Sequence, residues 1–197
     1  MTSGDTSSAL SHFEQSATIF TQLVAENRDG EVSSCNLATS HSEIADCHVM
    51  AGSVEEARQH YKKALTIWSD WLLKNPDDSI AAEYLAFTLA TCDVDSLRDG
   101  KRAVEIAKRV CDATGYKKTE HLECLAAAYA EVNDFESAIR LVMKAIELAG
   151  DDSRASQRYA RQLANYKEKK PLRASMFWKT PEASDAPTAN KVSPGDG

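Results

Sequence analysis

The fold is decided by residues 119–150, which read TEHLECLAAAYAEVNDFESAIRLVMKAIELAG. Apolar and small residues recur along this stretch with the period of about 3.6 residues that is typical of an amphipathic helix. Asn133 and Asp134 interrupt the pattern, and Gly150 ends it. Because such residues favour turns, we predict two helices here, one before Asn133 and one between Asp134 and Gly150.

The helical pattern extends over most of the remaining chain. Of the 5 prolines, only Pro76 lies before Lys170, and the alternating runs of β-branched residues that mark strands are absent. The predicted fold class is therefore all-α. Ser53 is expected to cap the third helix. The predicted helices cover residues 7–27, 31–51, 53–74, 79–91, 97 or 99 to 114, 119–132, 134–150 and 153–169.

An internal repeat is visible within this pattern. Residues 119–150 follow the spacing W-x2-L-G-x2-Y…A-x3-F…A at Leu122, Leu125, Ala126, Tyr129, Ala138, Val142 and Ala145. The same frame recurs upstream, with anchor alanines at Ala9, Ala57 and Ala103 before Ala138, spaced by 48, 46 and 35 residues. Small residues at these positions let two helices cross closely, so the pattern predicts stacked helix hairpins. An irregular helical bundle is the alternative.

With these motifs, residues 9 to about 170 resemble the tetratricopeptide repeat (TPR) family, and residues 125–131, LAAAYAE, are similar to a version of the repeat in bacterial TPR proteins. The resemblance implies an α-solenoid of antiparallel helix hairpins. The expected solenoid consists of a partial repeat at 7–30, repeats at 31–76, 79–115 and 119–150, and a basic capping helix at 153–170. Residues 1–6 and 171–197 are expected to be disordered, because the tail is rich in Pro, Ala, Ser, Thr and Asp.

Composition and charge limit the classes of function. The chain has 197 residues and a net charge of −7, which weighs against nucleic acid as the main partner. No apolar run approaches the roughly 18–20 residues of a membrane helix, and the polar residues 1–8 lack the pattern of a secretory signal. The 5 cysteines form no C-x-x-C pair and are expected to be buried free thiols. We therefore expect a cytoplasmic protein that does not insert into membranes.

The histidines do not predict a metal site. His41 and His48 lie seven residues apart on one predicted helix, and a rise of about 10.5 Å is too long for both to bind one zinc ion. His48 is expected to pack within its repeat. The other three, His12, His60 and His121, are isolated in the sequence and are expected at the surface.

No other motif predicts catalysis or a cofactor. Gly-rich phosphate loops and nucleophile motifs are absent, and Asp93, Asp95 and Asp99 lack the glycine and the closing glutamate of a calcium loop. We therefore expect a protein that is not an enzyme and that carries no cofactor or metal. Turnover that depended on His41, His48 or Asp46 would revive the enzymatic alternative.

The TPR resemblance implies that the first helices of the hairpins form a concave groove for peptide segments. Its predicted lining is Thr39, Ser42, Asp46, Val49, Ile80, Glu83, Phe87, Glu120, Glu123 and Ala127. This set is acidic with an apolar centre at Phe87, which favours a basic or amphipathic peptide; a solvated acidic face without a ligand is the alternative. The clamp with which some TPR proteins bind a terminal carboxylate is excluded, because Ser42, Asp46 and Tyr84 stand at its positions.

Two other segments are candidates for interaction. Between Arg154 and Lys179 there are eight basic residues and one acid, which indicates a solvated face of the capping helix, a patch for an acidic partner, nucleic acid or anionic membrane, or pairing with the acidic repeats. Residues 176–178, Met-Phe-Trp, are expected to dock on the last hairpin or to serve as a linear motif.

The predicted function is that of a non-catalytic adaptor that binds a segment of another protein. The alternative is a structural subunit that forms a homo-oligomer through the exposed side of the first helix, at Ile19 and Leu23.

Overall fold

A computed structural model describes residues 3–26, 30–150 and 153–178. These ranges contain helices and no strand, which confirms the all-α prediction for the described part of the chain. The elements are α1 (Ser3–Ala25), α2 (Gly30–Met50), α3 (Val54–Lys74), α4 (Ser79–Thr91), the 3-10 turn η1 (Asp95–Leu97), α5 (Gly100–Thr114), α6 (Thr119–Glu131), α7 (Phe135–Ala149), α8 (Ser153–Lys167) and the short α9 (Ser175–Trp178).

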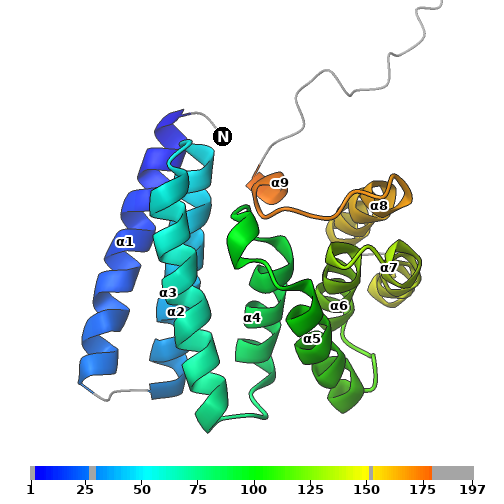
Figure 1. The fold of residues 1–197 in the computed structure, drawn as a ribbon, viewed down its shortest axis with the longest axis horizontal. Coiled ribbons are helices and arrows are strands. Elements are labelled where there is room, and N and C mark those ends of the chain that lie inside the picture. Colours follow the sequence, from blue (N-terminus) through cyan, green and yellow to red (C-terminus); the bar gives the residue numbers. More distant parts are fainter. Residues whose placement is uncertain (1–2, 27–29, 151–152, 179–197) are drawn as a thin grey trace, which may run out of the picture.

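The helices pack in chain order. Each of the helices α1 to α8 contacts its neighbours in the sequence, and α4 also contacts both α2 and α6. Figure 1 shows this progression from the blue α1 at one side of the molecule to the yellow α7 and orange α8 at the other. Packing of this kind is consistent with a helical repeat.

The core lies where the helices cross. The alanines Ala57, Ala103 and Ala138 are fully buried, so the backbones of paired helices approach closely. Larger side chains such as Trp68 and Leu122 fill the space between hairpins. Ala9 of the predicted partial repeat is only half-buried, because α1 packs mainly against α2.

Aspartates begin three of the helices. The carboxylate of Asp78 accepts hydrogen bonds from the backbone N–H groups of Ile80 and Ala81, and Asp99 and Asp134 cap α5 and α7 in the same way. Ser53 is the N-cap residue of α3, as predicted, but its side chain makes no capping hydrogen bond. The expected start of the fifth helix near residue 97 is also corrected, since η1 precedes it and α5 begins at Gly100.

The chain ends depart from the expected disorder. Helix α1 begins at Ser3 rather than at residue 7, and residues 171–178, which we call the C-terminal strap, are ordered. The strap is fixed because Leu172 is buried in the main core and the polar groups that follow it find partners on other elements. Residues 1–2 and 179–197 lie outside the described part of the chain, and the disorder expected for them stays a prediction.

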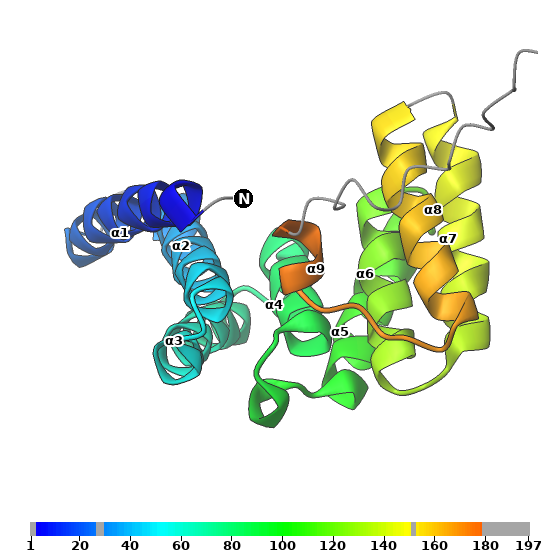
Figure 2. The same ribbon diagram turned by 90° about the horizontal axis from the view of Figure 1, so that it is seen from above.

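The strap also takes a different path from the one expected for residues 176–178. It runs from the end of α8 past α6 and ends as α9 beside α4, where it contacts α2 (Figure 2). It therefore reaches the middle of the molecule instead of docking on the last hairpin. Met176 stays partly exposed, and the side chains that follow it are outside the described part.

Gly100 marks a close approach between α5 and α6, and we expect Gly100→Ala to destabilise the protein by about 1–2 kcal/mol. A Cβ atom at this position would lie 2.8 Å from Val132 Cγ1 and 2.9 Å from Glu131 Cγ. Urea denaturation measures the loss, with the exposed Lys101→Ala as the control that leaves stability nearly unchanged. A variant as stable as the native protein would show that the two side chains move aside freely.

Candidate binding groove

Seven of the predicted groove residues line two adjoining pockets. The α2–α4 pocket has a volume of about 220 Å³ and is lined by Thr39, Ser42, Glu43, Asp46, Tyr61, Trp68, Tyr84, Phe87, Thr88, Thr91, Cys92 and Ala174. The α4–α6 pocket has a volume of about 270 Å³ and is lined by Glu83, Tyr84, Phe87, Glu120, Glu123 and Arg158. Because Tyr84 and Phe87 line both, the two pockets form one groove across α2, α4 and α6, which we call the acidic groove.

The remaining predicted residues lie elsewhere. Val49 packs against the small cluster around Val94, Ile80 is exposed outside both pockets, and Ala127 is buried in the core. These three residues therefore do not line either of the two pockets. A shared helix face was the only signal for them, and neighbouring helices decide which part of such a face stays open.

Aromatic side chains form the wall of the α2–α4 pocket, among them Trp68, which the sequence pattern did not assign to the groove. The rings of Trp68 and Tyr84 are stacked, with centroids 5.8 Å apart and an angle of 8° between the planes. Trp68 is buried, and within the described residues its indole N–H has no hydrogen-bond partner. Trp68 comes from α3, a second helix of a hairpin, which is why a search restricted to first helices missed it.

Carboxyl groups surround this aromatic wall. Burial, and then the neighbouring charge of Asp46, raise the pKa of Glu43 to about 7. The hydroxyl of Tyr61 donates a hydrogen bond to Asp46, and burial raises the pKa of this tyrosine above its ordinary value. Asp46 is thus held in place by a buried neighbour while Glu43 lies close to its protonation midpoint at neutral pH.

The α4–α6 pocket gathers three glutamates. Burial, together with the charges of Glu120 and Glu123, raises the pKa of Glu83 to about 7, and Lys118 opposes this shift. Glu83 Oε2 lies 3.3 Å from Nε2 of His121. His121 is buried, which lowers its pKa, so the expectation of a surface histidine is wrong.

Glu123 is the most buried carboxylate of the groove. Its Oε2 lies 2.9 Å from the guanidinium of Arg158, and its Oε1 accepts a hydrogen bond from Gln162. Both partners come from α8, so part of the basic C-terminal segment pairs with an acidic residue of the earlier helices. Despite Arg158, burial raises the pKa of Glu123.

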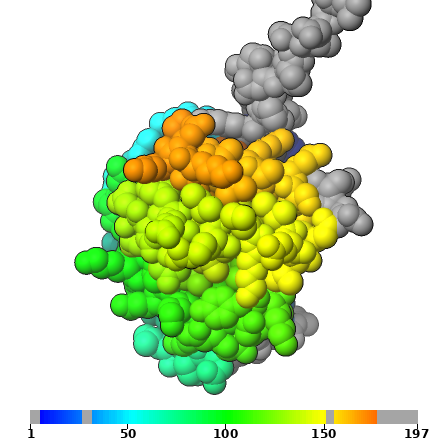
Figure 3. Space-filling view, turned by 90° about the vertical axis from the view of Figure 1, so that its right-hand side faces the viewer, coloured from blue at the N-terminus to red at the C-terminus, as the bar shows by residue number. Residues whose placement is uncertain are grey.

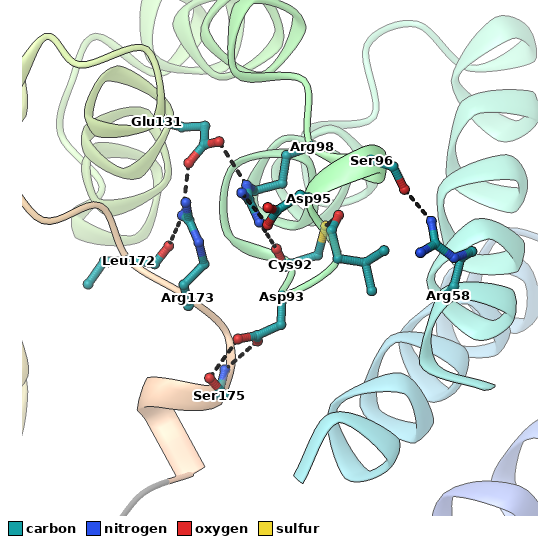
Figure 4. Close-up of polar contacts among 11 residues, drawn as sticks. Arg58, Cys92, Asp93, Asp95, Ser96, Arg98, Glu131, Leu172, Arg173 and Ser175 are labelled. Carbon is teal, nitrogen blue, oxygen red and sulfur yellow. Dashed lines mark hydrogen bonds and ion pairs between the residues drawn. The ribbon is translucent and has the colours of Figure 1, made fainter. Parts of the chain in front are cut away.

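The strap closes the groove at the end of α4. Ala174 lines the α2–α4 pocket, and its backbone N–H donates to the carbonyl of Thr91 over 2.8 Å. The backbone N–H and the hydroxyl of Ser175 donate to Asp93 over 2.8 and 2.7 Å. Figure 4 shows the contacts between Ser175 and Asp93 beside the ion pair between Arg173 and Glu131.

Glu131 joins the strap to α6 and to the loop before α5. It accepts from Arg98 over 2.8 Å and from Arg173 over 2.8 Å (Figure 4). Arg98 also donates to the carbonyl of Cys92 over 2.9 Å. All three charged side chains of this Glu131 network are largely buried, and Glu131 is the carboxylate that the two arginines share, although Arg98 also pairs with Asp95.

A second group of titratable residues lies outside the groove. Nδ1 of His41 and Nδ1 of His60 are 3.2 Å apart, and the ring of His48 lies 5.6 Å from that of His60. His60 is therefore not the isolated surface residue that was expected. Burial and the neighbouring histidines and Lys63 lower its pKa to about 4, which keeps the ring neutral at neutral pH.

No group of three or more His, Cys, Asp or Glu side chains in the described ranges could hold a metal ion. Asp93 accepts hydrogen bonds from Ser175, Asp95 pairs with Arg98, and Asp99 caps α5. None of the five cysteines, all of which lie in the described ranges, forms a disulfide bond, and four of them are buried, with burial raising the pKa of Cys92 to about 12.

The chain matches no protein-family model and no curated protein. Within the described ranges, no helix has the length and apolar character needed to cross a membrane. The described residues form an all-helical array with an acidic, aromatic-walled groove across α2, α4 and α6.

Proposed function

We propose that the protein is a non-catalytic adaptor with a TPR-like α-solenoid, and that its acidic groove binds a basic or amphipathic segment of another protein. The observation that carries this proposal is the continuity of the two pockets. Five carboxyl groups, from Glu43, Asp46, Glu83, Glu120 and Glu123, surround an apolar centre formed by Phe87, Tyr84 and Trp68. Apolar side chains of a ligand would contact the rings while its cations approach the carboxylates.

Features of the fold support the solenoid part of the proposal. The anchor alanines of the three full repeats are buried at the helix crossings, as close packing within hairpins requires. Helix α8 packs on α7 and supplies Arg158 and Gln162 to Glu123, which suits a capping helix. The buried indole N–H of Trp68 has no acceptor in the described residues, and a backbone carbonyl of a bound peptide is one group that would supply it.

Self-association through α1 receives less support. Ile19 is exposed, but Leu23 is half-buried. Ile19 is the one strongly exposed large apolar side chain among the described residues of α1, which is far less than the area a stable interface buries.

The proposal is tested by the binding of a fluorescein-labelled peptide of about twelve residues with alternating Lys and Leu. Glu120→Lys is expected to weaken binding about tenfold by repulsion, because Glu120 is exposed at the rim of the groove. Glu83 and Glu123 suit this test less well, since each contacts a buried partner. Fluorescence anisotropy gives the affinity, and circular dichroism checks the fold.

Glu105→Lys is the matched control. It makes the same charge change at an exposed position on α5, outside both pockets, and is expected to leave affinity within about twofold of the native value. If both variants weakened binding equally, the affinity would depend only on the net charge of the protein, which would contradict the proposal. A peptide with Glu in place of every Lys that bound as tightly would contradict it as well.

A further inference from the structure

A third pocket adjoins the acidic groove at its α8 end. It has a volume of about 330 Å³ and lies between α8 and the strap, with Arg158, Arg161, Gln162, Asn165, Leu172 and Met176 in its lining. Arg158 also lines the α4–α6 pocket, so the third pocket continues the groove. Figure 3 shows this end of the molecule, with the orange strap along the upper edge of α7 and α8.

The charge of the groove reverses in this pocket. Its lining contains two arginines and no acidic residue, whereas the α4–α6 pocket contains three glutamates. Arg158 is held by Glu123, and its guanidinium also lies over the ring of Tyr159, 4.9 Å from the centroid. Arg161 makes no ion pair within the described residues, so its charge is the one that remains for a ligand.

Gln162 adds a hydrogen-bond acceptor with a fixed direction. Its side chain is only 2% exposed, and its amide N–H donates to Glu123. This hydrogen bond fixes which way the amide points and leaves Oε1, which has no partner in the described part of the chain. A buried acceptor without a partner is uncommon, and an N–H group of a ligand would satisfy it.

We propose that the pocket between α8 and the strap is an acidic-residue subsite, in which the carboxylate of a peptide side chain pairs with Arg161 and a peptide N–H donates to Gln162. The proposal rests on the proposed function in one respect, since the residue bound here belongs to the segment that the acidic groove binds. The partner segment then has a basic, apolar part that lies in the acidic groove and an acidic residue that lies beside it, in the pocket at the α8 end.

The donor set favours a peptide over a phosphate-bearing ligand. A phosphate group has no N–H to give to Oε1 of Gln162, and it would leave the apolar side chains of Leu172 and Met176 without a contact. An acidic residue within a peptide brings a carboxylate, an N–H and a hydrocarbon stem together.

The first test isolates the subsite from the rest of the groove. N-acetyl-aspartate N-methylamide is titrated to about millimolar concentration while NMR follows the side-chain N–H signals of Arg161 and Gln162. Both signals are expected to shift, and the asparagine analogue is expected to shift them much less. In Arg161→Gln the response of Gln162 is lost, while Lys167→Gln, an exposed cation on the same helix, keeps it. Equal shifts with both compounds, or a response that survives in Arg161→Gln, would overturn the proposal.

The second test links the subsite to the acidic groove. The Lys-Leu peptide extended by one aspartate is expected to bind about fivefold tighter than the same peptide extended by asparagine, and Arg161→Gln removes this preference. Tight binding of both peptides without a preference would overturn the subsite and leave the proposed function standing. Shifts with the small probe but no binding of either peptide would overturn the proposed function and the link between the two sites.

Discussion

Replacing Glu131 by alanine is expected to lower the free energy of unfolding by about 3 kcal/mol and to release the strap. The carboxylate of Glu131 accepts from both Arg98 and Arg173, and the side chains of these residues are 11%, 14% and 23% exposed in the order Arg98, Glu131 and Arg173. Alanine would leave two guanidinium groups largely buried without their shared partner. The loss is therefore larger than that of a surface ion pair, which contributes about 0–1 kcal/mol.

Two measurements check this prediction. Urea denaturation gives the change in the free energy of unfolding, and limited trypsin digestion reports the strap, because Arg173 becomes accessible when its partner is removed. Glu136→Ala is the matched control, since Glu136 also pairs with an arginine but is 87% exposed. If both variants lost equally little stability and the strap resisted trypsin, the Glu131 network would not be what holds it.

The affinity of the acidic groove for the Lys-Leu peptide is expected to rise steeply with pH around neutrality. The pKa values of Glu43 and Glu83 are raised to about 7, so each carboxyl is mostly neutral one unit below this value and mostly ionised one unit above it. A cationic ligand binds the ionised form, so affinity is gained as pH rises through about 7 and is lost on acidification. If both carboxyls must be ionised, the gain reaches about a hundredfold between about pH 6 and pH 8.

The charged groups around Glu83 favour the same increase of affinity with pH. Glu83 faces Glu120 and Glu123 with Lys118 and His121 nearby, and a bound cation offsets the repulsion among the three glutamates. Lysine side chains of the ligand stay charged across the whole range, so the protein alone supplies the pH dependence.

Anisotropy titrations at several pH values give this profile. The double variant Glu43→Gln with Glu83→Gln is expected to bind weakly at every pH and to flatten the curve. Calorimetry in buffers with different ionisation enthalpies should detect proton release from the native protein on binding. Affinity that is constant with pH, or that increases in acid, would contradict the role of these carboxyls.

Local sequence signals predicted most of the helices. The turn at Asn133 and Asp134 and the glycine at the end of α5 lie where the pattern breaks, because caps and turns depend on nearby residues. The strap was missed because its contacts are far apart in the sequence: Arg173 reaches a partner 42 residues away, and Ser175 one 82 residues away. Composition alone indicates disorder for such a segment, because composition does not show which distant residues the segment contacts.

The acidic groove was predicted in part for a related reason. Positions on the first helices follow from helical spacing, which placed Asp46, Glu83 and Phe87 on one face. Residues that come from other elements, such as Trp68 from α3 and Arg158 from α8, depend on how the hairpins pack. The burial of Glu123 and His121 likewise depends on the helices around them, so a sequence pattern that places them on a helix face leaves their exposure open.

The most direct test of the proposed function is to locate the bound peptide on the protein. A photo-reactive benzoylphenylalanine replaces one leucine of the Lys-Leu peptide, and mass spectrometry identifies the labelled residues after irradiation. We predict labels on α2, α4 and α6 near Phe87 and Tyr84, reduced by Glu120→Lys and unchanged by Glu105→Lys. Labels confined to α1, or to the outer helices α5 and α7, would contradict the assignment of the acidic groove as the binding site.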